Sequence, residues 1–278
     1  MDFAQPIAEG LWSLALDTPT LLPATQTNSY LVAEGDALVL VEPATPYEYE
    51  QIRLFSAIDA QLALGRVLTH LVLTHHHMDH VGATLAVQKR YGVPVAAHEG
   101  TAEKLRDLIA IDTLLTEGST LLGGALEVLF TPGHAPGHVS LLHRASGSAI
   151  VGDMVASVGT IVIDPEDDGD MQRYLVELER LKHTGCDRLL PAHGAPIEDG
   201  PKHLQYYRDH RLGREAKIYA ALAAFDHGCA DTELVSRAYD DVPSTIWPVA
   251  LRSLRAHLEK LLRESRVTHN GNVWRAVS

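Results

Sequence analysis

Short apolar runs, rich in leucine and valine, alternate with amphipathic stretches from residue 11 to about residue 200. Runs of this kind, bounded by polar or glycine-containing turns, predict strands. The predicted strands are Leu11–Leu16, Ser29–Ala33, Ala37–Val41, Leu68–Leu73, Val93–Ala97, Leu126–Phe130, Val139–His143, Ala149–Val151 and Arg188–Pro191. Helices are predicted at Gly82–Tyr91, Thr101–Ile109 and Met171–His183, the last with Asp170 as its N-cap. Short strands mixed with helices predict a layered α/β domain.

After residue 200 the pattern changes to helices alone. Amphipathic spacing predicts helices at Arg214–Phe225, from Asp231 or Thr232 to Ala238, and at Pro248–Glu264. The following Asn270-Gly271 pair is typical of a β-hairpin turn. Three helices followed by a hairpin is the order of a winged helix-turn-helix. We therefore expect two domains, residues 1–200 and residues 201–278.

Composition and charge narrow the function classes. No apolar run approaches the roughly 18 residues of a membrane span, and no signal-peptide pattern opens the chain, so we expect a cytoplasmic protein without membrane contact. The two cysteines, Cys186 and Cys229, lie far apart and are expected to be free thiols. The net charge is −16 over residues 1–200 and +3 over residues 201–278. This acidity argues against polyanion binding by the first part.

The stretch "LVLTHHHMDHVGA", Leu71–Ala83, carries the densest chemistry. Side chains two apart on an extended segment point the same way, so His75 and His77 can reach one point. Asp79 and His80 then turn toward a neighbouring point. Imidazole nitrogens and carboxylate oxygens suit zinc and similar divalent ions. This segment therefore predicts a metal site.

Three more donors each follow an apolar strand, where the chain leaves the sheet: His134 in "TPGH", Asp153 in "VGD" and His193 in "PAHG". Together with the four donors of the histidine-rich segment they make seven. Two cations, each with three such ligands and sharing a bridging carboxylate, would use all seven. The sequence therefore predicts two divalent metal ions, most readily Zn²⁺, with iron and manganese as alternatives.

The set HxHxDH, TPGH, GD and PAHG, in this order, resembles the metallo-β-lactamase superfamily of hydrolases over residues 10–200. The resemblance implies an αββα sandwich with a two-metal cleft at one edge. It implies that His75, His77 and His134 bind one metal. It further implies that Asp79, His80 and His193 bind the second, with Asp153 bridging. The stretch "HRLGREAKIYAAL", the three helices and the final hairpin are similar to the winged-helix appendage of a branch that includes a metal-dependent endoribonuclease.

Some residues fit this pattern less closely. Family members often carry Asp-Gly after an early strand, where this chain has Glu42-Pro43 in "VLVEPAT". Asn28 and His138 are candidates for contact with substrate. A turn role for Asn28, and a hydrogen-bonded place at a strand start for His138, are the alternatives.

Two metal ions can lower the pKa of a shared water toward ~7, and Asp79 could orient the resulting hydroxide and move its proton. The preferred interpretation is a hydrolase of small esters, thioesters or lactones. One alternative is a phosphodiesterase acting on single-stranded RNA, favoured by the appendage and its positive balance. Another is a non-enzymatic winged-helix regulator that binds DNA. A homo-oligomer is compatible with all three.

Overall fold

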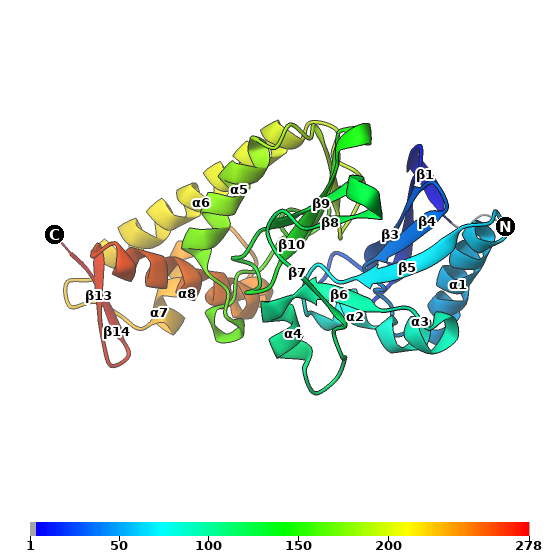
Figure 1. Ribbon diagram of the computed structural model, residues 1–278. Helices are drawn as coiled ribbons and strands as arrows, with labels where there is room; N and C mark the ends of the chain where they lie inside the picture. The colour runs from blue at the N-terminus through cyan, green and yellow to red at the C-terminus, as the bar shows by residue number, and fades with distance from the viewer. Residues whose placement is uncertain (1–3, 278) are drawn as a thin grey trace. The chain divides into compact units, whose positions relative to one another are not determined.

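Two sheets in the computed structural model, which describes residues 4–277, are built from strands in nearly sequential order (Figure 1). The larger sheet contains β1 (Gln5–Ala8), β2 (Leu11–Asp17), β3 (Gln26–Glu34), β4 (Ala37–Val41), β5 (Val67–Val72), β6 (Val95–His98) and β7 (Thr113–Leu115). Its first four strands are antiparallel, and β4 to β7 are parallel. The smaller sheet has the order β12 (Arg188–Pro191), β11 (Ser148–Gly152), β10 (Val139–His143), β9 (Leu126–Phe130) and β8 (Thr120–Leu121), with β11 and β12 parallel.

Alternation along the strands divides the interior into two cores. On β4, Leu38 and Leu40 face one core, whereas Val39 and Val41 face the other, because successive side chains of a strand point to opposite faces. The first core is closed by α1 (Glu48–Leu62), α2 (Met78–Val81), α3 (Thr84–Tyr91) and α4 (Glu99–Leu105). The second core lies between the two sheets. Helices, sheet and sheet thus form successive layers.

The chain's contacts define two compact units. The first contains the residues up to 131, 136–160 and 183–200; the second contains 132–135, 161–182 and the residues from 201 onward. The chain passes from the first unit to the second after residue 200, where the sequence predicts the domain boundary. The predicted division into two domains stays a prediction. The assignment of 132–135 and 161–182 to the second unit was not foreseen. None of the helices within residues 4–277 is long and apolar enough to cross a membrane.

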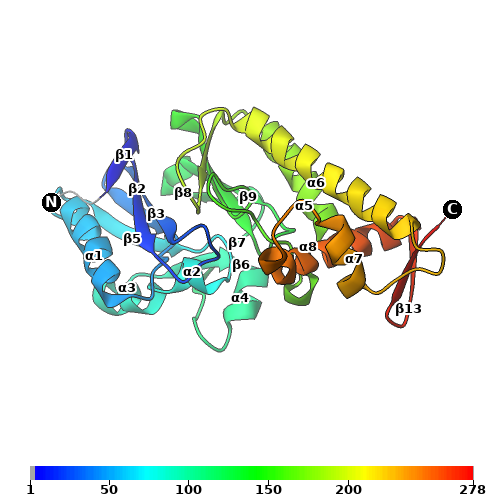
Figure 2. The same cartoon turned by 180° about the vertical axis from the view of Figure 1, so that it is seen from behind.

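The second unit is mainly helical. It includes α5 (Met171–Lys182), most of α6 (Gly200–Ala223), α7 (Asp231–Ala238) and α8 (Trp247–Arg263), followed by a hairpin of β13 (Val267–Asn270) and β14 (Val273–Ala276). α5 and α6 run side by side in both views (Figures 1 and 2). The buried apolar faces of α6, α7 and α8 and the buried Trp274 of β14 share one core. The predicted order of three helices and a hairpin is confirmed.

Several predicted boundaries are wrong in instructive ways. α1 was not predicted at all. The helix expected at Gly82–Tyr91 is α3, which begins two residues later, and the short α2 before it was not predicted. The helix expected at Thr101–Ile109 is α4, which begins two residues earlier and ends four residues earlier. The final turn residues are Gly271 and Asn272, since Asn270 already pairs with Val273. Both cysteines are free, as predicted, and the structure buries both.

Candidate metal centre

The turn between β5 and α2 delivers four of the predicted ligands. β5 ends at Val72, and His75 follows three residues later with its side chain fully buried. His75 Nε2 and His77 Nδ1 lie 2.9 Å apart, so both rings present a nitrogen to the same point. His77 is the N-cap residue of α2, and Asp79 and His80 lie within that helix. This turn therefore brings together donors from an extended segment and donors from a helix.

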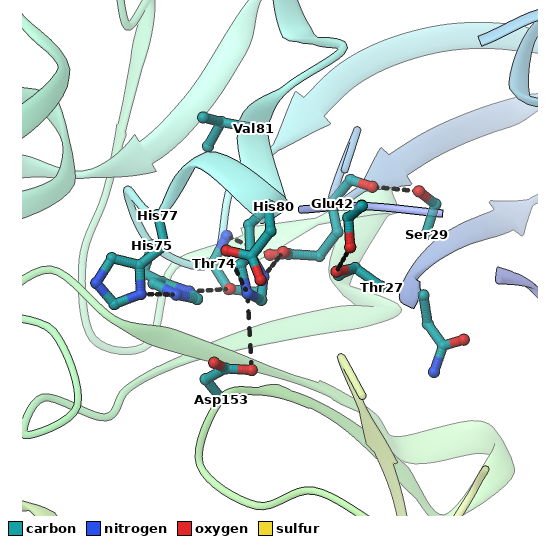
Figure 3. Close-up of polar contacts among 12 residues, drawn as sticks. Thr27, Ser29, Glu42, Thr74, His75, His77, His80, Val81 and Asp153 are labelled. Atoms are coloured by element: carbon teal, nitrogen blue, oxygen red, sulfur yellow. Dashed lines mark hydrogen bonds and ion pairs between the residues drawn. The ribbon is translucent and has the colours of Figure 1, made fainter. Parts of the chain in front are cut away.

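Two further predicted ligands come from the neighbouring parallel strands β11 and β12. Asp153 and His193 follow the ends of these strands, and His193 Nε2 lies 3.3 Å from Asp153 Oδ1. His193 Nε2 is 3.6 Å from Asp79 Oδ2, and His80 Nε2 is 3.7 Å from both Asp79 Oδ1 and Asp153 Oδ1. Figure 3 shows His80 between Glu42 and Asp153. The structure thus brings together six of the seven predicted ligands within the first unit.

The donor atoms fall into two neighbouring groups. Ligand atoms of Asp79, His80 and His193 lie within 4.8 Å of one another, as do those of His75, His77 and Asp153. This division agrees with the two groups that the sequence predicts. Asp153 also lies next to the first group through His80 and His193, so its position suits a carboxylate shared by two cations.

Most of these rings are anchored through Nδ1, which turns Nε2 toward the cluster. His75 Nδ1 bonds Thr74 Oγ1 at 2.9 Å, His80 Nδ1 bonds the Glu42 carboxylate, and His193 Nδ1 donates to the Gln26 carbonyl at 3.0 Å. Metal-binding histidines characteristically use their second nitrogen in this way, because the outer bond fixes the ring orientation and the tautomer.

The seventh predicted ligand, His134, lies in the segment 132–135 of the second unit. Its Nδ1 donates to the Val162 carbonyl at 2.8 Å, also within that unit. His134 therefore has the same kind of anchor as the other histidines. The chain belongs to the first unit again from Pro136, so only four residues make up this excursion.

The electrostatics of the cluster favour a cation. Burial lowers the pKa of His80, but the carboxylates of Glu42, Asp79 and Asp153 outweigh it and hold that pKa well above its ordinary value. Burial raises the pKa of Asp153, yet His193 and His80 hold it well below the usual range. Several carboxylates thus face imidazoles that ligate metals when they are neutral.

One atom tests directly whether a metal would fit. His80 Nε2 is buried and has no hydrogen-bond partner among residues 4–277. An unpaired buried polar atom destabilises a fold, and native structures rarely leave one without a reason. The nitrogen faces Asp79 and Asp153, and imidazole with carboxylate is a donor set that suits Zn²⁺ and related ions. The residues present therefore fit a divalent metal.

Comparison with known protein families decides the family. The model of the metallo-β-lactamase superfamily matches residues 22–193, which include all seven predicted ligands. The chain belongs to the metallo-β-lactamase superfamily. A second model, the β-lactamase-associated winged helix domain, matches residues 232–274. The superfamily and the appendage that the sequence motifs predict are both confirmed, as is the α/β fold.

Relatives of this superfamily member cover most of its length. The beta-lactamase-like protein 2 homolog of Drosophila melanogaster is 26% identical over 90% of this chain and 86% of its own. A beta-lactamase domain protein from Burkholderia ambifaria has a TM-score of 0.83 at 22% identity, over 99% of this chain and 93% of its own. A protein solved in a di-iron-bound form matches with a TM-score of 0.51 and 28% identity, over 66% of this chain and 96% of its own.

Glu42 is the most important residue whose role the sequence did not reveal. It was identified only as a departure from the superfamily's Asp-Gly pair. Its fully buried carboxylate accepts a hydrogen bond from the Thr74 N–H at 2.9 Å and binds His80 through the other oxygen. Its backbone has a φ of 59°, a conformation that costs a residue with a side chain about 1–2 kcal/mol. The only hint of this role in the sequence was a charged residue directly after the apolar run of β4.

Asn28 and His138 hold ligand-bearing loops in this metallo-β-lactamase fold. Asn28 Nδ2 donates to the carbonyls of Pro191 (2.9 Å) and Gly194 (2.7 Å), on either side of His193. His138 is fully buried. Its Nδ1 bonds Thr131 Oγ1, its Nε2 accepts from the Asp153 N–H, and burial lowers its pKa to about 3. His138 thus has no ring nitrogen available for a substrate, which favours the structural alternative.

Proposed function

We propose that this superfamily hydrolase binds two divalent metal ions through the seven predicted ligands. His75, His77 and His134 would hold one, and Asp79, His80 and His193 the other, with Asp153 between them. The two donor groups, the Nδ1 anchors and the buried Nε2 of His80 support this assignment. Zn²⁺ suits the donors best, and the relative solved in a di-iron-bound form supports iron as an alternative.

The chain's own contribution to hydrolysis centres on Asp79. When bound, a pair of divalent ions supplies Lewis acidity and lowers the pKa of water to near neutrality. Asp79 is the more exposed of the two carboxylates, with 16% of its side chain accessible against 10% for Asp153. Its oxygens face His80 and His193, so it can orient an attacking water and accept its proton. Glu42, Thr74 and Gln26 keep the imidazoles in place during this step.

For the substrate, we propose a small ester, thioester or lactone, cleaved in the cytoplasm. The net charge of −16 over residues 1–200 disfavours a polyanionic substrate. The arginines of α8, the helix that a nucleic-acid-binding winged helix would use, already pair with acidic residues of their own unit. RNA cleavage and DNA-binding regulation are therefore the less supported alternatives.

Metal analysis combined with a substrate panel tests this function. The purified protein is loaded with Zn²⁺ and offered acyl thioesters, esters, lactones and a single-stranded RNA. We expect two metal equivalents and turnover of at least one acyl substrate. Asp79→Asn should lower kcat by 100-fold or more, the scale of lost general acid–base catalysis. Asp36→Asn, a change at the exposed β3–β4 turn, is the matched control and should keep activity.

The outcomes separate the alternatives. Cleavage of RNA without turnover of any acyl substrate would replace the proposed substrate class with the phosphodiester one. Sequence-specific DNA binding by a protein that hydrolyses nothing would favour the regulator. Fewer than two metal equivalents in an active enzyme would contradict the dinuclear assignment.

A further inference from the structure

The acidic loop from residue 161 to residue 170 is fastened to the last helix of the second unit. Arg252 Nε lies 3.5 Å from Asp164, Arg255 Nη1 lies 2.6 Å from Glu166, and Arg263 Nη1 lies 2.7 Å from Asp170. The three arginines follow one another along α8, and their partners follow one another along the loop. The contact is therefore a series of matched ion pairs along one face of α8.

A second helix fastens the beginning of the same loop. The guanidinium of Arg211, on α6, donates to the Ile161 carbonyl, and Arg211 itself is only 5% exposed. The loop is thus held at its start by α6 and along its length by α8. Arg211 and α8 both belong to the second unit.

The fastened loop in turn holds the segment that carries His134. The Val162 carbonyl accepts the bond from His134 Nδ1 at 2.8 Å, and the Asp170 N–H donates to the Gly133 carbonyl at 2.8 Å. Gly133 has a φ of 132°, and a Cβ there would lie 2.4 Å from the Tyr174 backbone of α5. The segment 132–135 therefore lies tightly against the loop and the start of α5.

Asp170 joins the two sets of contacts. Its Oδ1 caps α5 by accepting from the N–H groups of Gln172 (2.9 Å) and Arg173 (3.1 Å), and its Oδ2 pairs with Arg263. Burial raises its pKa, but Arg263 and the helix amides lower it below the ordinary value, so the carboxylate is charged at neutral pH. One residue thus connects α8, α5 and the His134 segment.

We propose that the winged-helix part acts as a positioning element for a metal ligand: α8, through Arg263 and Asp170, fixes the loop that orients His134. The inference rests on the proposed function, because it takes His134 as a ligand of one metal. Arg263 and Asp170 are positioning residues that touch neither metal nor substrate. The arginines on this face of α8 therefore pair with acidic residues of the same unit. In a protein that binds nucleic acid, such arginines would instead contact phosphates.

Selective metal loss is the expected signature. In Arg263→Gln, one of two metal equivalents should bind about 3- to 10-fold more weakly in a chelator competition, and the other should be unchanged. The visible spectrum of the Co²⁺-loaded protein should change, because one histidine is less well oriented. Amide exchange should accelerate in residues 133–135. Arg263→Lys should retain all three properties, since a lysine keeps a positive charge that can pair with the Asp170 carboxylate.

Two further variants make the test specific. Asp170→Asn keeps an acceptor for the helix cap but removes the charge, so it should reproduce the Arg263→Gln result. Lys217, on α6 of the same unit, forms an exposed ion pair with Asp240. Lys217→Gln breaks this pair and should behave as wild type.

Failure of the inference and failure of the proposed function give different results. If wild type binds two equivalents and Arg263→Gln changes neither affinity, spectrum nor exchange, the positioning role is wrong and the metal assignment stands. If wild type binds no second equivalent, or His134→Ala leaves both affinities intact, the metal assignment itself is wrong. Equal weakening by Lys217→Gln would show a general loss of stability and overturn the positioning role.

Discussion

At the scale of single residues, Glu42 occupies the position where charge and geometry are most closely linked. Its two carboxylate oxygens accept from two different donors, the Thr74 N–H and the His80 ring. No uncharged side chain of similar size offers two equivalent acceptors. The left-handed backbone at Glu42 is maintained by these bonds and by the Ser29 hydroxyl, which donates to its carbonyl.

Glu42→Gln should weaken metal binding by about 10- to 100-fold, the range typical of residues that orient a metal ligand. A glutamine has one acceptor oxygen and one NH₂ donor, so either Thr74 or His80 must face a donor. Chelator competition measures the affinity. Glu9→Gln, at the exposed turn between β1 and β2, is the control, and equal effects of both substitutions would contradict the role of Glu42.

A second residue-scale prediction concerns pH. His257 is fully buried beside Glu215, Lys260 and Arg211, and burial lowers its pKa below the ordinary 6.5. The unfolded chain therefore binds a proton as the pH falls below about 6.5, whereas the folded unit resists it. The pKa of Glu215 is lowered as well, because its bonds to His257 and Lys260 outweigh burial. Both shifts make the stability of the second unit fall on acidification, first below pH 6.5 and further below about 4.5.

Thermal melts followed by the fluorescence of Trp247 and Trp274 test this dependence. Wild type should lose melting temperature steadily between pH 7 and pH 5. His257→Leu should flatten that interval, because the titrating group is gone. A variant with the same slope as wild type would show that another group is responsible.

At the scale of elements, the sequence predicted strands better than helix ends. Four strands, among them Ala37–Val41 and Arg188–Pro191, have the predicted bounds, because buried apolar runs end where polar residues begin. α6 begins at Gly200, not at the predicted Arg214. Pro201, in its first turn, is a start signal that the prediction did not use. Gly213 lies inside the helix with open space around it, so the helix continues through a residue of low helix propensity.

The sequence predicted which donors lie together in the candidate site, but not the groups that support them. The order and spacing of the histidines and aspartates identified the donors, since each follows a strand. The anchors are different. Backbone carbonyls such as those of Gln26 and Val162 leave no trace in the sequence, because any residue supplies one. The assignment of His134 to the second unit depends on packing in the same way.

The end of β11 gives an element-scale prediction. Gly152 has a φ of 47°, and a Cβ there would lie 2.6 Å from His138 Nε2 and 2.7 Å from Thr74 Oγ1. Gly152→Ala should lower the free energy of unfolding by about 2 kcal/mol or more, since strain and overlap add. Gly147→Ala meets the same strain at φ 62° without any neighbour within 4 Å, and should cost about 1 kcal/mol. Denaturant melts measure both, and equal losses would show that the overlap is relieved.

At the scale of the whole molecule, negative and positive charges are concentrated in different parts of the chain. The first 200 residues are strongly acidic, and much of that acidity near the cluster is carried by Glu42, Asp79 and Asp153, which a pair of cations would neutralise. The positive balance of residues 201–278 is matched in part by ion pairs with the loop that ends at Asp170. Neither part therefore needs a nucleic acid to balance its charge.

Metal removal should accordingly lower global stability. A ligand present at 100 times its Kd stabilises the folded state by about 2.7 kcal/mol, and two such ions add. Treatment with a chelator should lower the melting temperature measured by calorimetry, and added Zn²⁺ should restore it. An unchanged transition after verified metal removal would contradict the proposed metal centre.

The bond from Asn28 to Pro191 has a consequence for how the protein is made. It joins residues 163 positions apart, and it places His193. During synthesis the six-residue segment from His75 to His80 emerges long before its distant partner can arrive, since such remote contacts form late. If the proposed metal assignment holds, a growing chain would have only these local donors for a first ion. Under the proposed assignment, the second metal site would be complete only when β12, the last strand of the smaller sheet, has joined, so the hydrolase would become active at the end of folding.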